Sequence, residues 1–225
     1  LVAPGLAFNT QGKSMSDISP FVISISDEQI TDLKNRIANT RWPDAETAAN
    51  WNQGVPLAYV KELVQYWGEQ YDQQRLANRL NAFDNFKTSL LGLNIHFIHI
   101  RSSKPNARPL LLTHGWPGSV VEFLKVIGPL TEPQEHGGNA DDAFHLVIPS
   151  LPGYGFSDKP QAAGWGVEKI AEAWSALMAR LGYSRYFAQG GDWGSVITSY
   201  IARQDPDHCL GIHINMGIVA PDPNA

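Results

Sequence analysis

The sequence of 225 residues contains a single cysteine, Cys209, so it can form neither an intrachain disulfide nor a metal cluster built on several cysteines. It has no run of lysine and arginine, and its formal net charge is -5, which argues against nucleic acid as a partner. No apolar run approaches the roughly 18 residues that a membrane-spanning helix needs. We therefore expect a soluble protein without a membrane span. The interpretation favours a cytoplasmic over a secreted or periplasmic location, although one cysteine leaves the redox compartment open.

The first part of the chain has helical patterns and no clustered chemistry. With 43% hydrophobic residues the chain can bury a core, and its length predicts one domain, or one domain with an appendage. Little periodicity precedes Pro20, which indicates an arm. Ser26 and Gln29 form a capping-box pattern that opens a helix ending near residue 41, and Pro56 opens a second. A third helix is expected over 73–83. We predict an N-terminal arm and helical appendage over residues 1–85, with its aromatic stripes in a core.

From residue 86 onward, strands and helices alternate. The expected elements are a hairpin over 88–100, a strand over 109–113, a helix through 120–127, a strand over 144–148, a helix over 167–181, a strand over 184–189, a helix from 195 and a last strand over 211–216. Such alternation predicts an α/β fold with a doubly wound, mostly parallel sheet, here over residues 86–220. Ligands of these sheets bind beyond the carboxyl ends of the strands.

One acidic residue lies where a predicted strand meets a predicted helix. Residues 189–195 read Gln-Gly-Gly-Asp-Trp-Gly-Ser, and the glycines allow a tight turn around Asp192. The layout is that of a nucleophile elbow, Gly-x-Ser-x-Gly, with aspartate in place of serine. A carboxylate needs no base to activate it and can attack saturated carbon, leaving an ester on the enzyme. The alternative is that Asp192 only caps the following helix, because aspartate is a good N-cap residue.

Two further motifs occur, together with the turn around Asp192, in the order and at a spacing compatible with a known family. Residues 114–118 read His-Gly-Trp-Pro-Gly, and residues 149–157 read Pro-Ser-Leu-Pro-Gly-Tyr-Gly-Phe-Ser. Together with residues 189–195 they resemble the α/β-hydrolase fold, and specifically its microsomal-type epoxide hydrolases. Ile-Ser-Asp-Glu-Gln at 25–29 and Arg-Trp-Pro at 41–43 resemble the extra N-terminal domain of that subfamily.

The resemblance, which covers about residues 21–216, implies a two-step mechanism without metal or organic cofactor. Asp192 would open a small hydrophobic epoxide to an alkyl-enzyme ester while tyrosines of a lid donate to the epoxide oxygen. A histidine oriented by a carboxylate would then activate water to release a vicinal diol, with the backbone N–H groups of Trp116 and Trp193 holding the oxyanion. In this family the histidine at the position of His114 supports its loop and is not the base.

The base itself has no good candidate in this chain. The fold places the acid and the histidine after the nucleophile, and only His208 and His213 follow Asp192, both too early in the chain. Residues 221–225 resemble the start of the connection to the lid. We therefore expect the chain to be the N-terminal part of a longer enzyme, with the lid and late sheet absent. Its expected partners are the C-terminal remainder of the same protein and a second copy in a homodimer.

Two other functions stay open at this point. A haloalkane dehalogenase-like enzyme also uses an aspartate followed by tryptophan, whose indole N–H can bind a leaving halide. A catalytically silent relative would only bind hydrophobic ligands or partners. Trp116 in its loop and the helical appendage favour the epoxide interpretation.

Overall fold

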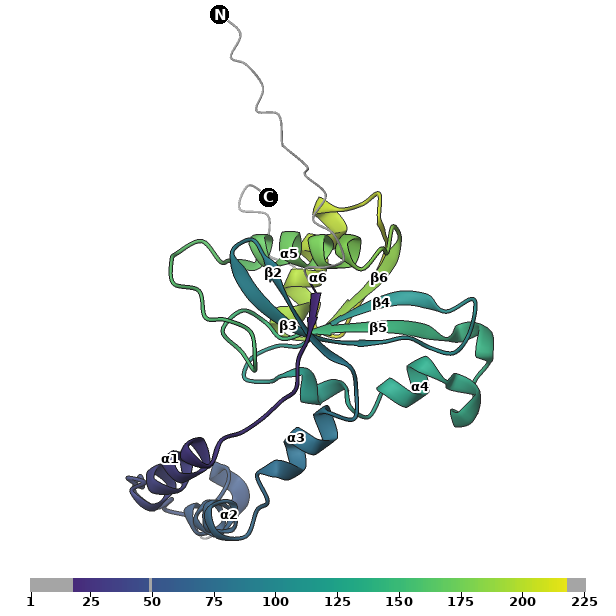
Figure 1. The fold of residues 1–225 in the computed structure, drawn as a ribbon. Coiled ribbons are helices and arrows are strands. Elements are labelled where there is room, and N and C mark those ends of the chain that lie inside the picture. The colour runs from purple at the N-terminus through teal and green to yellow at the C-terminus, as the bar shows by residue number, and fades with distance from the viewer. Residues whose placement is uncertain (1–17, 49, 218–225) are drawn as a thin grey trace, which may run out of the picture. The chain divides into compact units, whose positions relative to one another are not determined.

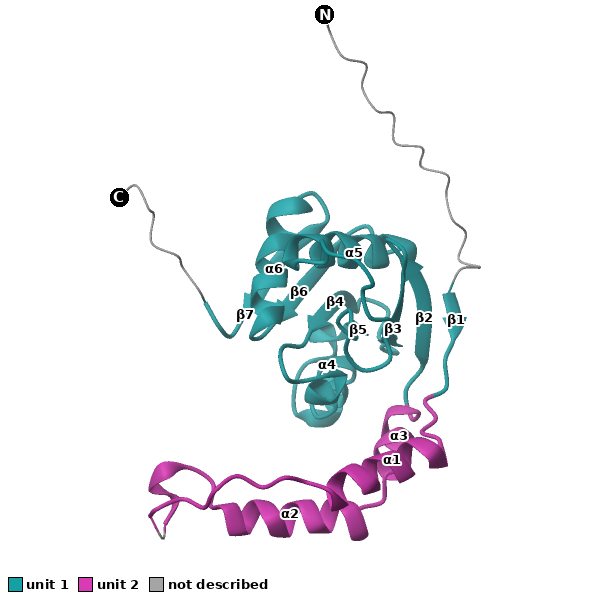
Figure 2. Cartoon of the chain, turned by 90° about the vertical axis from the view of Figure 1, so that its left-hand side faces the viewer, with its two compact units in different colours: residues 1–22, 83–225 teal, residues 23–82 magenta. Residues whose placement is uncertain are grey.

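The computed structural model describes residues 18–48 and 50–217, which fall into two compact units (Figure 2). One unit comprises residues 23–82, and the other combines the described residues on either side of it. The division at residue 85 into an appendage and a core stays a prediction. Residues 1–17 of the predicted arm and the lid connection at 221–225 lie outside the described residues.

Three helices form the unit of residues 23–82. They are α1 (Asp27–Ala38), α2 (Leu57–Glu69) and α3 (Gln74–Leu80). The predicted capping box opens α1, because the Gln29 N–H donates to Ser26 Oγ at 3.2 Å and the Ser26 N–H donates to Gln29 Oε1 at 3.0 Å. Helix α2 begins directly after Pro56, as predicted. Helices α1 and α2 approach closely, since a Cβ at Gly68 would lie 3.0 Å from Ile37 Cγ2.

The expectation that the aromatic stripe of α2 is core is wrong. Neither α1 nor α2 contains a buried residue. Of the predicted stripe, Leu63 and Trp67 are 54% and 43% exposed, and Val60 and Val64 are only partly buried. Helical spacing shows only that apolar residues share a face, and not what covers that face. The single helix α1 beside it offers too little surface to enclose that face.

A mixed sheet of seven strands forms the other unit (Figure 1). The strands are β1 (Ile18–Pro20), β2 (Asn85–Leu90), β3 (Leu93–Ile100), β4 (Arg108–Thr113), β5 (Phe144–Pro149), β6 (Tyr186–Gly190) and β7 (Cys209–Ile214). Their order is β1-β2-β3-β5-β4-β6-β7. Pairs from β1 to β5 are antiparallel, and the pairs that join β5, β4, β6 and β7 are parallel. The parallel half therefore brings the carboxyl ends of β4 and β6 side by side.

Strand β1 lies at the end of the stretch for which the sequence predicts an arm. Its three residues pair antiparallel with β2, with Ile18 opposite Thr88 and Pro20 opposite Phe86. A strand this short has no periodicity to detect in the sequence. It forms because the edge of β2 offers main-chain donors and acceptors to pair with.

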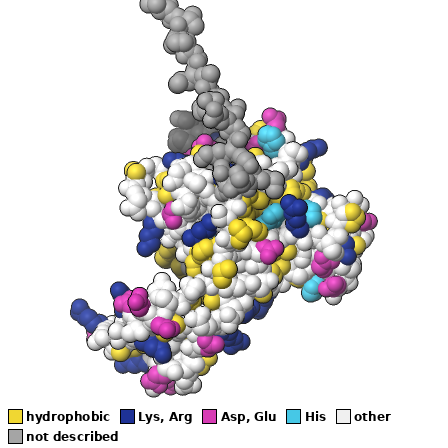
Figure 3. Space-filling view, viewed as in Figure 1, with side chains coloured by type: hydrophobic (Ala, Val, Ile, Leu, Met, Phe, Trp, Pro, Cys, Tyr) yellow, Lys and Arg dark blue, Asp and Glu magenta, His cyan; other side chains and the backbone are white. Residues whose placement is uncertain are grey.

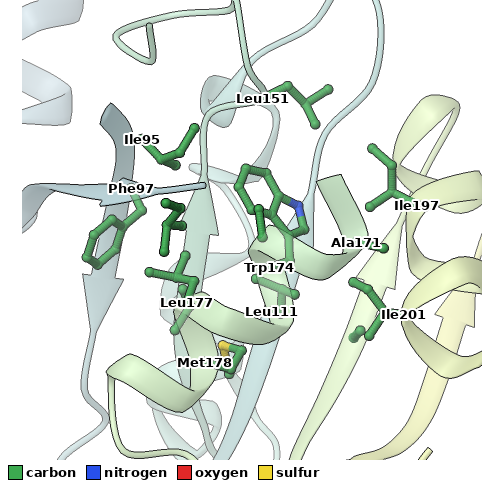
Figure 4. Packing of buried hydrophobic residues seen from close by; sticks show 14 of the residues in the cluster. Ile95, Phe97, Leu111, Leu151, Ala171, Trp174, Leu177, Met178, Ile197 and Ile201 are labelled. Atoms are coloured by element: carbon green, nitrogen blue, oxygen red, sulfur yellow. The ribbon is translucent and has the colours of Figure 1, made fainter. Parts of the chain in front are cut away.

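The core lies between one face of the sheet and two helices, α5 (Val167–Arg180) and α6 (Trp193–Gln204) (Figure 4). Trp174 is fully buried and is the largest of the side chains that α5 adds to this core. The buried cluster joins Ile95, Phe97, Leu111 and Val147 of the strands to Leu177, Met178, Ile197 and Ile201 of the helices. Burying a large apolar side chain of this kind contributes about 1.5–3 kcal/mol. This packing holds α6, and therefore the turn before it, rigidly on the sheet.

The helix predicted through residues 120–127 is wrong as a single element. The chain instead makes a 3₁₀ turn over Val120–Phe123 and a short helix, α4 (Ile127–Thr131). Pro129 supplies the reason, because its ring excludes a helical carbonyl four residues earlier, at Lys125. Ser119 caps the 3₁₀ turn, with its Oγ accepting from the Val121 N–H at 3.3 Å.

The other face of the parallel half is partly open. A cavity of about 680 Å³ runs along it, lined by side chains that include Leu110, Phe123, Phe187 and Ile212. Ile212 and Leu210 of β7 are 41% and 42% exposed. Apolar surface of this extent on a sheet normally marks a contact with further structure.

Three features concern possible binding to a membrane, a metal ion or a charged partner. None of the helices in the described ranges combines the length and the apolar character needed to cross a bilayer. Within residues 18–48 and 50–217, no group of three or more His, Cys, Asp or Glu side chains could hold a metal ion. On the face drawn in Figure 3, basic and acidic side chains are interspersed.

Candidate active site

The turn between β6 and α6 carries Asp192, as the sequence predicts. The residue has φ 51° and ψ -126°, a conformation that costs a non-glycine residue about 1–3 kcal/mol. Neighbouring bonds hold it there. The Ser195 N–H donates to the Asp192 carbonyl at 2.9 Å, and Ser195 Oγ donates to the Gly190 carbonyl at 2.8 Å. Backbone strain maintained in this way is typical of functional sites.

Glycines on both sides of the turn are required by close backbone contacts. A Cβ at Gly190 would lie 2.0 Å from the Gly194 carbonyl oxygen, and one at Gly194 would lie 2.1 Å from the Thr113 carbonyl oxygen. Both obstacles are main-chain atoms, which cannot move aside as a flexible side chain could. The beginning of α6 is therefore packed directly against the end of β4.

The carboxylate of Asp192 is exposed and is held by main-chain donors. The Trp116 N–H donates to Asp192 Oδ1 at 2.7 Å. The N–H of Trp116, and after it that of Trp193, lower the pKa of Asp192 below its ordinary value, against a small opposing effect of desolvation. Trp116 reaches this position because Thr113 at the end of β4 is in register with Gly190 at the end of β6. The group is therefore ionised at neutral pH and needs no base to attack.

The sequence left open that Asp192 only caps the following helix, and this geometry does not support that alternative. The Asp192 side chain makes no capping hydrogen bond to α6, so its place at the N-terminus of the helix is not explained by capping. Trp116 and Trp193 are 64% and 53% exposed as whole residues, so neither is a core residue. The structure brings all three predicted site residues together at one edge of the sheet.

His114 lies close to the site in sequence, but both of its ring nitrogens are engaged elsewhere. Its Nε2 accepts from the Leu151 N–H at 3.1 Å, which leaves the proton on Nδ1 to donate to the Gly115 carbonyl at 3.0 Å. Burial lowers the pKa of this imidazole, with an opposing contribution from the Gly115 carbonyl. The ring is thus neutral and ties two loops together, which fits the supporting role that the resemblance implies.

The two histidines after Asp192 lie at different ends of β6: His208 contacts its amino end, and His213 is in register with Gln189 near its carboxyl end. His208 pairs through Nδ1 with Asp205, and its carbonyl accepts from the Tyr186 N–H at the first residue of β6. The five residues of β6 then separate it from the elbow, a distance of roughly 16 Å at about 3.3 Å per residue. His213 lies inside β7, as predicted. This geometry supports the view that the base is not His208.

Sequence reasoning missed two residues beside the elbow. A Cβ at Gly115 would lie 2.4 Å from Asp192 Cβ, so the loop after β4 touches the carboxylate residue directly. Glu122 lies in the segment 120–127, for which the sequence predicts a helix, and that pattern gives its charged side chain no role in the site. Its pKa is raised, chiefly by burial, and Asp192 contributes to the shift. A titratable residue four positions after the 114–118 motif was the only available signal.

Comparisons with known proteins match the fold described above. The family model for the alpha/beta hydrolase fold matches residues 108–225, just over half of the chain. The chain belongs to the α/β-hydrolase fold family. This α/β-hydrolase also matches the family model for the epoxide hydrolase N terminus over residues 18–123. The predicted fold class is confirmed.

Relatives of this α/β-hydrolase include proteins named as epoxide hydrolases. A protein of Stigmatella aurantiaca whose name proposes an epoxide hydrolase is 54% identical over 91% of this chain and 47% of its own length. Epoxide hydrolase 1 of Sus scrofa is 39% identical over 90% of this chain and 45% of its own length. The crystal structure of juvenile hormone epoxide hydrolase from Bombyx mori superposes with a TM-score of 0.78 at 40% identity, covering 88% of this chain and 53% of that one. The chain thus spans about half the length of the relatives it matches, and the resemblance to microsomal-type epoxide hydrolases is confirmed.

Proposed function

We propose that the protein containing this chain hydrolyses small hydrophobic epoxides to vicinal diols, with Asp192 as the nucleophile. The observation that carries the proposal is the exposed carboxylate whose Oδ1 accepts from the Trp116 N–H at 2.7 Å. That contact leaves Oδ2 to attack an epoxide carbon in line, which breaks the C–O bond of the ring and forms the ester. The names of the similar proteins give the same reaction class.

The second step, hydrolysis of the ester, takes place at the same two main-chain donors, but the negative charge now develops on Oδ1. Water attacks the ester carbon of Asp192, and the former Oδ1 becomes the oxyanion. The Trp116 N–H already points at this oxygen, and the Trp193 N–H follows the nucleophile directly, so two main-chain donors can stabilise the developing charge. Collapse of the intermediate restores the carboxylate and releases the diol, whose new hydroxyl oxygen comes from Asp192.

The other catalytic groups of the proposed mechanism would lie outside this chain. A histidine base, its acid partner and lid tyrosines would come from the C-terminal remainder of the protein, which we also propose as the partner that covers the open sheet face lined by Phe187 and Ile212. A homodimer and a cytoplasmic location stay predictions from the sequence.

An isotope experiment on the full-length protein tests the nucleophile. One turnover with excess enzyme in ¹⁸O-labelled water should give a diol that carries no label, because its oxygen comes from Asp192. Repeated turnover should then place ¹⁸O in the proteolytic peptide that contains Asp192. Label in the diol of the first turnover would mean direct attack by water and would contradict the ester mechanism.

The haloalkane dehalogenase-like alternative predicts a different product. It is favoured only by the aspartate-tryptophan pair at 192–193, which such enzymes share. Incubation with short bromoalkanes should release no bromide, whereas a small epoxide should give diol. A silent binding protein would form neither product, and no modified Asp192 peptide would appear by mass spectrometry.

A further inference from the structure

Glu122 braces the turn that carries the Trp116 donor. A Cβ at Gly118 would lie 1.4 Å from Glu122 Oε1, so the glutamate occupies the space against this glycine. The Gly118 N–H in turn donates to the Gly115 carbonyl at 3.0 Å, and Gly115 contacts Asp192. The turn of residues 115–118 is thus held between two acidic residues, one on each side.

The pKa values of these two acids are shifted in opposite directions. Burial raises the pKa of Glu122, the backbone N–H of Ser119 lowers it by donating to the carboxylate, and Asp192 raises it. The pKa of Asp192 is lowered by main-chain donors. Although Glu122 is exposed as a residue, its carboxyl end lies against the turn and not in open solvent. Paired carboxyl groups whose pKa values are pushed apart commonly have separate roles in one site.

We propose that Glu122 is a positioning residue for the reaction, because it fills the space at Gly118 and accepts from Ser119, and so aims the Trp116 N–H at Asp192 Oδ1. The inference rests on the proposed function. Its consequence falls mainly on ester hydrolysis, since the Trp116 donor is most needed when Oδ1 carries the full charge of the oxyanion. Opening of the epoxide by Oδ2 depends less on that donor.

Single-turnover kinetics of the full-length protein separate these two steps. Glu122→Ala should slow ester hydrolysis by about tenfold to hundredfold, less than the loss of a whole oxyanion donor. Ester formation should change by less than about threefold. Glu122→Gln keeps an oxygen that can accept from Ser119 and should recover most of the rate. Glu135→Gln, at an exposed position, is the matched control and should hydrolyse the ester at the wild-type rate.

A double-mutant cycle tests whether Gly118 is the point of contact. In Gly118→Ala the new methyl group would displace the Glu122 carboxyl, so ester hydrolysis should fall as it does in Glu122→Ala. Added to Glu122→Ala, the same change should have little further effect, because the obstructed group is gone. The inference is overturned if the two losses multiply, if both steps slow equally, or if Glu122→Ala behaves as wild type.

The outcome for the wild type distinguishes this inference from the function on which it rests. If the wild-type protein forms an ester on Asp192 and Glu122→Ala hydrolyses that ester at the normal rate, only the role of Glu122 fails. If the wild type forms no ester, the proposed function fails and the role of Glu122 fails with it.

Discussion

Strand β6 has an aspartate close to each of its ends, and the two are held in different ways. Beyond the carboxyl end, the pKa of Asp192 is lowered by the N–H groups of Trp116 and Trp193. Beside the amino end, burial acts to raise the pKa of Asp205, and the hydrogen bonds from His208, Tyr186 and Ser175 outweigh it, so the net shift is downward. Both side chains are therefore ionised carboxylates at neutral pH.

The difference lies in what each carboxylate has left to offer. Oδ1 of Asp205 pairs with His208, and Oδ2 accepts from the Tyr186 hydroxyl at 2.7 Å. Asp205 is thus fully used in a side-chain network that joins α6 to β6. Asp192 is exposed and has a strained backbone, and its Oδ1 accepts from a main-chain N–H. Its Oδ2 is the atom that attacks the epoxide in the proposed mechanism. A lowered pKa identifies an ionised carboxylate, and only free capacity for a new bond makes it a nucleophile.

The strongest test of this comparison is to neutralise each carboxylate in turn. Asp192→Asn should lower kcat for epoxide hydrolysis by about 10⁴-fold or more, as the loss of a covalent nucleophile does in other hydrolases. Its melting temperature should change little, since the side-chain oxygen of asparagine can still accept from the Trp116 N–H at this exposed position. Asp205→Asn should keep kcat within about twofold of the wild type. Equal loss of activity in the two variants would remove the distinction between the ends of β6.

The packing behind the elbow predicts the next largest effect. Gly194→Ala should lower the free energy of unfolding by about 3 kcal/mol or more, because the added methyl group meets the Thr113 carbonyl and neither backbone can shift freely. Gly217→Ala is the matched control, since a Cβ there meets nothing within 4 Å. Urea denaturation followed by circular dichroism measures both. A Gly194→Ala protein of wild-type stability would show that the elbow is less tightly packed than this structure indicates.

At the amino end of β6, the expected effect is on stability. Asp205→Ala should lower the free energy of unfolding by about 1–3 kcal/mol, because the buried Tyr186 hydroxyl loses its acceptor. Asp207→Ala, at an exposed neighbouring position, should change it by less than about 0.5 kcal/mol. Thermal unfolding of the three proteins in one buffer decides the matter, and a loss no larger than that of Asp207→Ala would mean that the network is not stabilising.

The smallest effect is a pH dependence of the same network. The hydrogen bond to Asp205 and its charge raise the pKa of His208 above the ordinary value of 6.5. A raised folded-state pKa means that the stabilisation is fully present below 6.5 and is lost as the pH rises through the folded value. The melting temperature of the wild type should therefore exceed that of His208→Gln at mildly acidic pH, and the two should converge at alkaline pH. A difference that does not change with pH would show that the charge of His208 is irrelevant.

Local signals in the sequence predicted much of this fold correctly. The capping box at Ser26, the helix start after Pro56 and the elbow around Asp192 depend on residues within a few positions of one another, so the sequence alone indicates them. The 120–127 helix failed because Pro129 acts four residues upstream of its own position. The aromatic stripe of α2 failed because burial depends on what covers a face and not on its spacing.

The candidate site divides in the same way. The motifs pointed to Asp192, Trp116 and Trp193, while the network of Asp205 and the contact of Glu122 with Gly118 gave no readable pattern. These contacts join positions that are close only because of how particular side chains pack. The strain at Asp192 was equally hidden, since aspartate is a residue type that many turns accept.

By itself the sequence determined that a carboxylate stands at a tight strand-to-helix turn, because glycine spacing and apolar periodicity are properties of neighbouring residues. Only the tertiary structure decided that this carboxylate meets a donor 76 positions away in the chain, at Trp116. The physical reason is the strand order: β4 pairs with β6 in parallel register, so two chain segments with no local relation end at the same edge of the sheet.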